Sequence, residues 1–105
     1  MDKSAVLKIV SDFGGVLESQ GVRPQKIVLF GSHSTGTQRE DSDIDLVVIS
    51  EDFAGKGYWE RIDILSAAIA IVFQPIEAIA MTPEEWERGD SLIADYAHNG
   101  EVVYG

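Results

Sequence analysis

The sequence contains no cysteine, only three prolines, and eight Lys and Arg residues against eighteen Asp and Glu. Without cysteine there can be no disulfide framework, no thiolate nucleophile and no zinc–thiolate cluster. The net charge of −10 repels polyphosphate backbones, which argues against broad, sequence-independent nucleic-acid binding. Since the lack of cysteine also fits a reducing compartment, we expect a cytoplasmic protein.

Long uncharged hydrophobic runs are also missing. The short apolar stretch near the N-terminus has acidic residues beside it, so we expect neither a signal peptide nor a membrane anchor. The chain has 105 residues, of which 45% are hydrophobic and 25% charged, and this composition is typical of a globular protein. Its glycines and prolines do not gather into a linker. We therefore predict one domain spanning residues 1–105.

Hydrophobic periodicity and turn residues predict the secondary structure. Apolar residues at three- and four-residue steps predict helices over residues 4–18, 58–73 and 82 to about 98, the last with a helix start at Thr82-Pro83-Glu84-Glu85 and a C-cap at Gly100. Short apolar runs predict strands over residues 27–30, 44–49 and 76–81, and residues 102–104 suit a short terminal strand. The predicted order is α-β-β-α-β-α, an α/β protein of the α+β kind.

The predicted helix over residues 58–73 is unusually apolar. One stripe of it carries Trp59, Ile62, Leu65, Ala68, Ile69 and Val72, and further apolar residues lie around it. We therefore expect the helix to be buried on more than one side. Because a small domain has little room to hide so much apolar surface, this helix also suggests either a homodimer or an interface with a partner protein.

Two aspartates at the start of the second predicted strand indicate a chemical site. Because side chains alternate along a strand, Asp43 and Asp45 leave the same face while Ile44 enters the core. Two neighbouring carboxylates repel each other unless a cation lies between them, and carboxylate oxygens suit Mg²⁺ or Mn²⁺. Gly31, at the end of the preceding strand, lets backbone amides approach phosphate closely, and Ser32 can cap a short helix facing the same ligand.

Glu77 is the candidate for a third oxygen ligand. It is the one ionisable residue within the predicted strand over residues 76–81, and a buried carboxylate without a partner costs several kcal/mol. If this strand lies beside the one over residues 44–49, Glu77 can reach Asp43 and Asp45 and complete a three-carboxylate site of the two-metal type. Alternatively, Glu77 is a charge on an edge strand that discourages aggregation. Ser42 either donates to phosphate or makes a local turn bond.

These residues resemble a known family. Gly31-Ser32, ten further residues, then Asp43-Ile44-Asp45 are similar to the signature of the minimal nucleotidyltransferases of the DNA polymerase beta superfamily. The resemblance extends through residues 52–62 and 76–86, and it implies the nucleotidyltransferase fold, a small mixed sheet with helices packed on it. It also implies attack of an acceptor oxygen on the α-phosphorus of a nucleoside triphosphate, usually ATP, with release of pyrophosphate.

The resemblance also implies roles for individual residues. Gly31, Ser32 and Ser42 would contact the nucleotide, and Asp43 and Asp45 would ligate two Mg²⁺ ions. Glu77 would bind the catalytic metal and help to deprotonate the acceptor. Many relatives have two arginines in the loop after the Gly-Ser pair, where this chain has His33 and Thr35. This difference bears on affinity and turnover, and Arg39 or Lys56 could replace the missing charge.

Small members of this family are often encoded beside a helical partner of the HEPN type and act as its antitoxin. The resemblance therefore implies transfer of AMP from ATP to a hydroxyl of such a partner. The alternative is a catalytically weak or inactive binding module that keeps the fold and neutralises its partner by occlusion.

Overall fold

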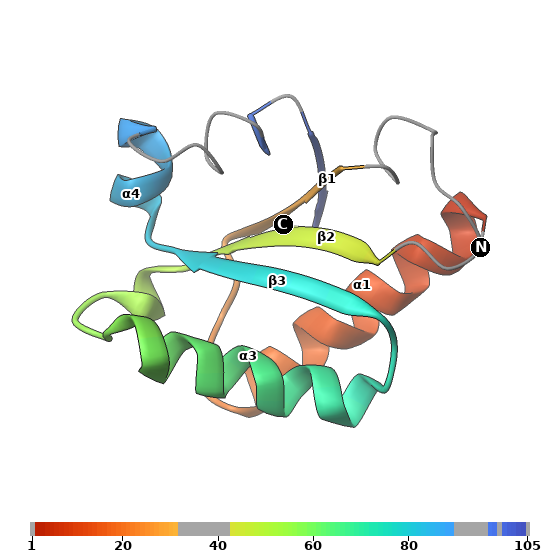
Figure 1. Cartoon of the computed structure of the whole chain (residues 1–105), viewed down its shortest axis with the longest axis horizontal. Coiled ribbons are helices and arrows are strands. Elements are labelled where there is room, and N and C mark those ends of the chain that lie inside the picture. Colours follow the sequence, from red (N-terminus) through yellow and green to blue (C-terminus); the bar gives the residue numbers. More distant parts are fainter. Residues whose placement is uncertain (1, 32–42, 90–96, 99, 105) are drawn as a thin grey trace.

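The computed structural model describes residues 2–31, 43–89, 97–98 and 100–104. Its helices and strands follow one another as α1 (Lys3–Ser19), β1 (Lys26–Phe30), β2 (Ile44–Ile49), the 3₁₀ turn η1 (Glu51–Phe53), α3 (Tyr58–Val72), β3 (Ile76–Met81), α4 (Pro83–Arg88) and β4 (Glu101–Tyr104) (Figure 1). The predicted order α-β-β-α-β-α is confirmed, with the short terminal strand added as β4. The turn η1 lies between β2 and α3, where the sequence predicted neither a helix nor a strand.

The four strands form one mixed sheet in the order β3-β2-β1-β4. β1 pairs antiparallel with β2 and with β4, whereas β2 and β3 are parallel. A parallel pair needs a crossover between its strands, and α3 provides it. The expected fold class, a small mixed sheet with helices packed on it, is therefore confirmed.

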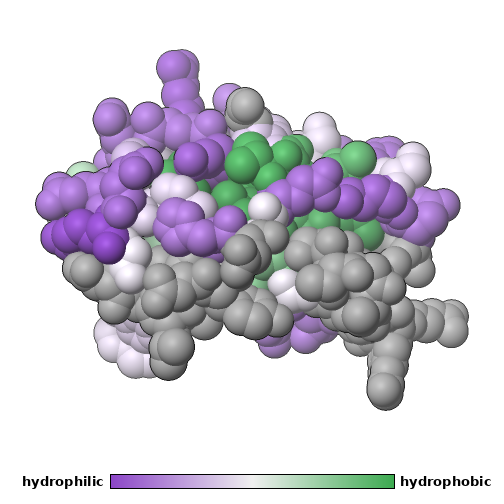
Figure 2. Space-filling view, turned by 90° about the horizontal axis from the view of Figure 1, so that it is seen from above, coloured by the Kyte–Doolittle hydropathy of each residue, from purple (hydrophilic) through white to green (hydrophobic). Residues whose placement is uncertain are grey.

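The helices cover the two faces of the sheet unequally. α1 and α3 lie side by side on one face, and α4 lies on the other (Figure 1). Between the sheet and the α1–α3 layer lies the larger core cluster, which includes Phe13, Leu17, Leu46 and Phe53. Trp86 of α4 belongs to a smaller cluster on the opposite face. Seen from the α4 side, hydrophobic side chains gather near the middle of the molecule, with hydrophilic side chains on either side of them (Figure 2).

The last predicted helix is shorter than expected. α4 begins as predicted, with Thr82 and Glu85 forming a complete capping box, but it ends at Arg88. Gly89 follows in the left-handed conformation at φ 65°, which terminates the helix, and residues 90–96 lie outside the described part. The prediction of one helix reaching His98 was therefore wrong. Gly100 is not a left-handed cap either, because its φ is not positive. A Cβ at Gly100 would collide with the carbonyl oxygen of Leu29 on β1.

The prediction that α3 is buried on more than one side was also wrong. Only Leu65 and Ala68 of this helix are fully buried. Trp59, which the sequence placed on the buried stripe, is 73% exposed. The excess apolar surface expected for this helix is therefore present, and it faces outward. None of the helices in the described residues is long and apolar enough to cross a membrane.

Candidate active site

Four of the predicted site residues lie where β1 ends and where β2 and β3 begin: Gly31, Asp43, Asp45 and Glu77. β1 runs antiparallel to β2, so its last residue, Phe30, pairs with Asp45. β3 runs parallel to β2, and its register places Glu77 beside Asp45 on the other side. Ile44 and Leu46 are fully buried while Asp45 is only partly so, which confirms the expected alternation along β2. The topology thus brings Asp45 and Glu77 together on one face, with Asp43 directly before β2.

Gly31 lies against Asp45 in a conformation that favours glycine. Its φ is +72°, and a Cβ added there would collide with the Asp45 carboxylate. A larger residue would thus be strained and would displace Asp45. The lack of a side chain at Gly31 therefore lets the Asp45 carboxylate come close to the Gly31 backbone.

The expectation that Glu77 is a buried carboxylate was wrong, whereas the alternative position on an edge strand agrees with the structure. Glu77 is exposed, because β3 is an edge strand of the sheet that the structure describes. Its pKa is nevertheless raised above the ordinary value for a glutamate. The main cause is a hydrogen bond from protonated Glu77 to Asp43, followed by the negative charges of Asp43 and Asp45. The three acidic groups therefore lie close enough to interact, and a cation would relieve their repulsion.

The donor set fits a hard divalent cation, since all three side chains offer carboxylate oxygens. Asp43, Asp45 and Glu77 are thus the residues that could hold Mg²⁺. No three acidic, histidine or cysteine side chains in the described ranges are already arranged as metal ligands. A pKa responds to charges several ångströms away, whereas Mg²⁺ requires oxygens at about 2.0–2.1 Å. These side chains would therefore have to move from their positions in this structure to bind a metal ion.

The remaining nucleotide-loop predictions cannot be placed. Ser32, His33, Thr35, Arg39 and Ser42 lie outside the described residues. Lys56, the other candidate for a compensating charge, precedes α3, at the opposite end of β3 from Glu77. Its ammonium group donates to the carbonyl oxygen of Asp52 at 2.7 Å. The structure therefore does not bring Lys56 to the carboxylate cluster.

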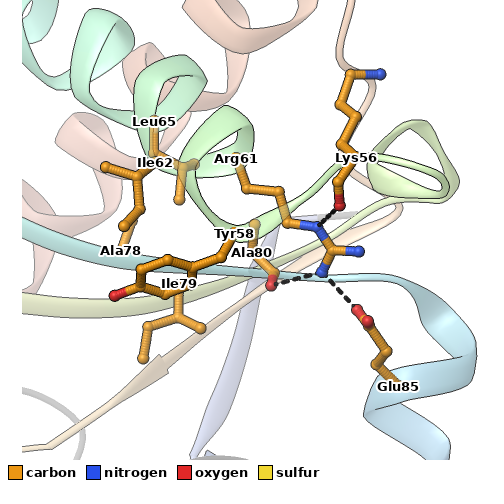
Figure 3. A pocket seen from close by; sticks show the side chains of 9 residues that line it. All are labelled: Lys56, Tyr58, Arg61, Ile62, Leu65, Ala78, Ile79, Ala80 and Glu85. Carbon is orange, nitrogen blue, oxygen red and sulfur yellow. Dashed lines mark hydrogen bonds and ion pairs between the residues drawn. The ribbon is translucent and has the colours of Figure 1, made fainter.

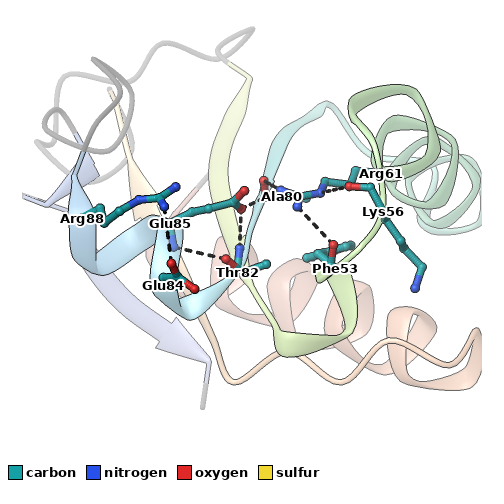
Figure 4. Close-up of polar contacts among 8 residues, drawn as sticks. All are labelled: Phe53, Lys56, Arg61, Ala80, Thr82, Glu84, Glu85 and Arg88. Carbon is teal, nitrogen blue, oxygen red and sulfur yellow. Dashed lines mark hydrogen bonds and ion pairs between the residues drawn. The ribbon is translucent and has the colours of Figure 1, made fainter.

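A polar network that sequence reasoning missed lies at that opposite end of β3. Arg61 of α3 donates to the carboxylate of Glu85 at 2.6 Å and to the carbonyl oxygens of Phe53, Lys56 and Ala80 (Figures 3 and 4). The Arg61 hydrogen bond is the main reason why the pKa of Glu85 is lowered. Because Arg61 and Glu85 are far apart in sequence and match no motif, only the tertiary fold reveals the pair.

The Arg61 network borders a cavity of about 380 Å³ between α3 and β3. Its other walls are mostly apolar, and they include Tyr58, Ile62, Leu65 and Ile79 (Figure 3). Each of the three side-chain nitrogens of Arg61 donates to at least one protein acceptor. This arrangement stabilises the junction of η1, α3, β3 and α4, and it lies apart from the three carboxylates.

Comparison with known proteins gives the same assignment as the geometry. The nucleotidyltransferase domain family matches residues 6–99. A candidate nucleotidyltransferase from Sulfolobus solfataricus has a similar fold, with a TM-score of 0.66 and 20% identity over 80% of this chain and 73% of that one. A chain from a toxin–antitoxin structure with AMP-PNP has a TM-score of 0.63 and 22% identity over 94% of this chain and 73% of that one. Curated proteins give no match.

The two solved structures share the fold, and the family match spans most of the sequence, including Gly31, Asp43, Asp45 and Glu77. The chain therefore belongs to the nucleotidyltransferase domain family and is a transferase.

Proposed function

We propose that this protein transfers a nucleoside monophosphate, AMP from ATP, to a hydroxyl group on a partner protein. The observation that carries this proposal is the strand register that sets Glu77 beside Asp45, with Gly31 on the other side of the same carboxylate. Three carboxylates next to a glycine turn are the groups that metal-dependent nucleotidyl transfer needs.

In the proposed reaction, the acceptor oxygen forms a bond to the α-phosphorus of ATP. The bond from that phosphorus to the bridging oxygen breaks, and pyrophosphate leaves. Glu77 takes up the hydroxyl proton, since its carboxylate is exposed to an incoming acceptor and its pKa is raised above the ordinary value. Asp43, Asp45 and Glu77 would hold two Mg²⁺ ions, or Mn²⁺, which when bound neutralise charge on the phosphates. Gly31, Ser32 and Ser42 contact the nucleotide in this proposal.

The acceptor is proposed to be a helical protein of the HEPN type, with this chain acting as the antitoxin of the pair in the cytoplasm. The structural neighbour from a toxin–antitoxin structure with AMP-PNP supports both the nucleotide and the partner. An acidic protein of net charge −10 is poorly suited to a nucleic-acid acceptor, which also favours a protein.

The test is nucleotide transfer with purified proteins. The protein, Mg²⁺ and the HEPN-type partner are incubated with ATP labelled either at the α- or at the γ-phosphate. AMP transfer labels the partner only from the α-label, whereas phosphoryl transfer labels it only from the γ-label and would contradict the proposal. The Asp43→Asn, Asp45→Asn double variant should not label the partner. Asp63→Asn, which removes an exposed carboxylate on α3, should label it normally.

The second candidate function is a binding module without catalysis, which the replacement of two family arginines by His33 and Thr35 favours. Calorimetry with ATP distinguishes the two functions. An active site predicts heat of ATP binding that depends on Mg²⁺ and is lost in the double aspartate variant. A binding module predicts no such heat while the partner is still neutralised.

A further inference from the structure

The strand that carries Glu77 also forms one wall of the cavity between α3 and β3. The next three residues along the strand, Ala78, Ile79 and Ala80, all line this cavity of about 380 Å³. Because side chains alternate along a strand, Glu77 and Ile79 point to the same face of the sheet, with about 7 Å between their Cα atoms. The cavity therefore begins one residue after the carboxylate that is proposed to take up the acceptor proton.

The strand order places this cavity on the opposite side of Asp45 from the glycine turn. Gly31 follows β1 and lies against the Asp45 carboxylate of β2, whereas Glu77 of β3 pairs with Asp45 on its other side. In the proposed function, Gly31 contacts the nucleotide. In-line displacement requires the attacking oxygen and the leaving pyrophosphate to lie on opposite sides of the phosphorus. An acceptor that approaches from the β3 side meets this requirement, so the cavity lies beside the acceptor rather than beside the nucleotide.

The walls of the cavity favour an apolar occupant. The charge of Arg61 at one end is already paired with Glu85 at 2.6 Å, and the ammonium group of Lys56 points away from the cavity (Figure 3). A charged group would therefore lose water beside mostly apolar walls, whereas an aliphatic or aromatic group gains free energy there. Ligand cavities usually measure about 300–1,000 Å³, so this one suits a side chain.

Tyr58 is the wall that meets the solvent. It is the first residue of α3, and its side chain is 70% exposed. The ring crosses Ile79, and its hydroxyl end lies on the side of Ala78, the residue that follows Glu77 (Figure 3). An apolar side chain that packs between Tyr58 and Ile79 would cover aromatic surface that now faces water.

We propose that this cavity binds an apolar side chain of the acceptor protein, close to the residue whose hydroxyl is modified. Because an extended chain advances about 3.3 Å per residue, this side chain belongs to a residue within about two positions of the acceptor. Tyr58 is then a positioning residue, which holds the acceptor segment so that its hydroxyl lies beside Glu77. The proposal rests on the proposed function, since it assumes transfer to a protein hydroxyl.

The experiment is steady-state kinetics of AMP transfer from α-labelled ATP, with the partner protein and ATP varied separately. Tyr58→Ala should raise KM for the partner about tenfold, which corresponds to about 1.4 kcal/mol of lost apolar contact. KM for ATP and kcat should not change, because the contact is made equally in the ground state and the transition state. Tyr58→Phe keeps the ring and should behave like the wild type.

Trp59→Ala is the matched control. Trp59 is the next aromatic residue of α3 and is 73% exposed, but it does not line the cavity, so both KM values should stay unchanged. Mass spectrometry of the labelled partner identifies the modified residue. We expect an aliphatic or aromatic residue within two positions of it. Replacement of that residue by asparagine should raise the partner KM with wild-type enzyme and have little further effect with Tyr58→Ala.

The possible outcomes separate this inference from the proposed function. A wild type that transfers no AMP would overturn the proposed function and this inference with it. AMP transfer with an unchanged partner KM in Tyr58→Ala would overturn the inference alone. A raised KM for ATP would assign the cavity to the nucleotide, and an equal effect of Trp59→Ala would assign the contact to the outer surface of α3. Either result would overturn the inference, and so would a modified residue with only polar neighbours.

Discussion

The carboxylate of Asp45 occupies the space that a side chain on Gly31 would need. The two residues come from adjacent ends of β1 and β2, and Asp45 pairs with Phe30, the residue directly before Gly31. The glycine is therefore required both for its left-handed backbone and for the position of an acidic side chain. These two requirements can be separated by mutation.

We expect Gly31→Ala to destabilise the fold and to reduce nucleotide binding. Gly55→Ala is the control, because Gly55 also has a positive φ, of +79°, but a Cβ there meets nothing within 4 Å. The control should lose about 1–2 kcal/mol of unfolding free energy from backbone strain alone. Gly31→Ala should lose more in urea denaturation and should also weaken Mg²⁺-dependent ATP binding. Equal losses in the two variants, with ATP binding intact, would contradict this account.

We expect Glu77→Gln to stabilise the protein when no divalent metal is present. The substitution removes a negative charge that Asp43 and Asp45 repel, and such surface terms amount to about 0.5 kcal/mol. Added Mg²⁺ should raise the melting temperature of the wild type more than that of the variant, because the variant lacks one ligand. Thermal unfolding with and without MgCl₂ measures both effects. Glu60→Gln, an exposed carboxylate on α3, should respond to Mg²⁺ like the wild type.

Two neighbouring glycines in α1 should respond to alanine in opposite ways. A Cβ on Gly14 would come within 2.5 Å of the Tyr104 ring on β4, whereas a Cβ on Gly15 meets nothing within 4 Å. Gly15→Ala should therefore stabilise the protein by up to about 1 kcal/mol through helix propensity. Gly14→Ala should destabilise it by about 1–3 kcal/mol, since the Tyr104 ring has to move. Urea denaturation of the two variants tests the prediction, and similar effects in both would contradict the packing of β4 on α1.

The contribution of Glu85 to stability should disappear in acid. The Arg61 hydrogen bond lowers the pKa of Glu85 below the ordinary 4.5, so the folded state favours the ionised form. The resulting stabilisation is fully present above pH 4.5 and is lost as the pH falls through the lower pKa of the folded state. Glu85→Gln, which can still accept the Thr82 backbone hydrogen bond, should be less stable than the wild type at pH 7. In denaturation at pH 3 this difference should shrink, and a constant difference would contradict the prediction.

Much of the fold could be predicted because it depends on local patterns. The strands over residues 44–49 and 76–81 agree with β2 and β3 in full, since each is a short, mostly apolar run bounded by residues that interrupt the pattern. The start of α4 also agrees, because Thr82, Pro83 and Glu85 form a local capping motif. Gly89, which ends that helix, was missed because apolar residues continue the helical pattern beyond it.

The site was predicted in part for the same reason. The sequence is enough to predict that β2 is a strand. Because side chains alternate along a strand, the spacing of Asp43 and Asp45 then places them on the same face. Whether Glu77 joins them depends on which strand lies beside β2, and that is a matter of topology. The sequence left two positions open for Glu77, a buried strand or an edge strand, and only the strand order shows that β3 lies at an edge of the described sheet.

The parallel pairing of β2 with β3 has a consequence for protein synthesis. Glu77 reaches Asp45 only after the chain has passed through α3 and returned alongside β2. A nascent chain that has released β1 and β2 from the ribosome therefore has two of the three carboxylates but not the third. The cluster is completed only when β3 emerges and docks, so an unfinished chain cannot hold a complete site.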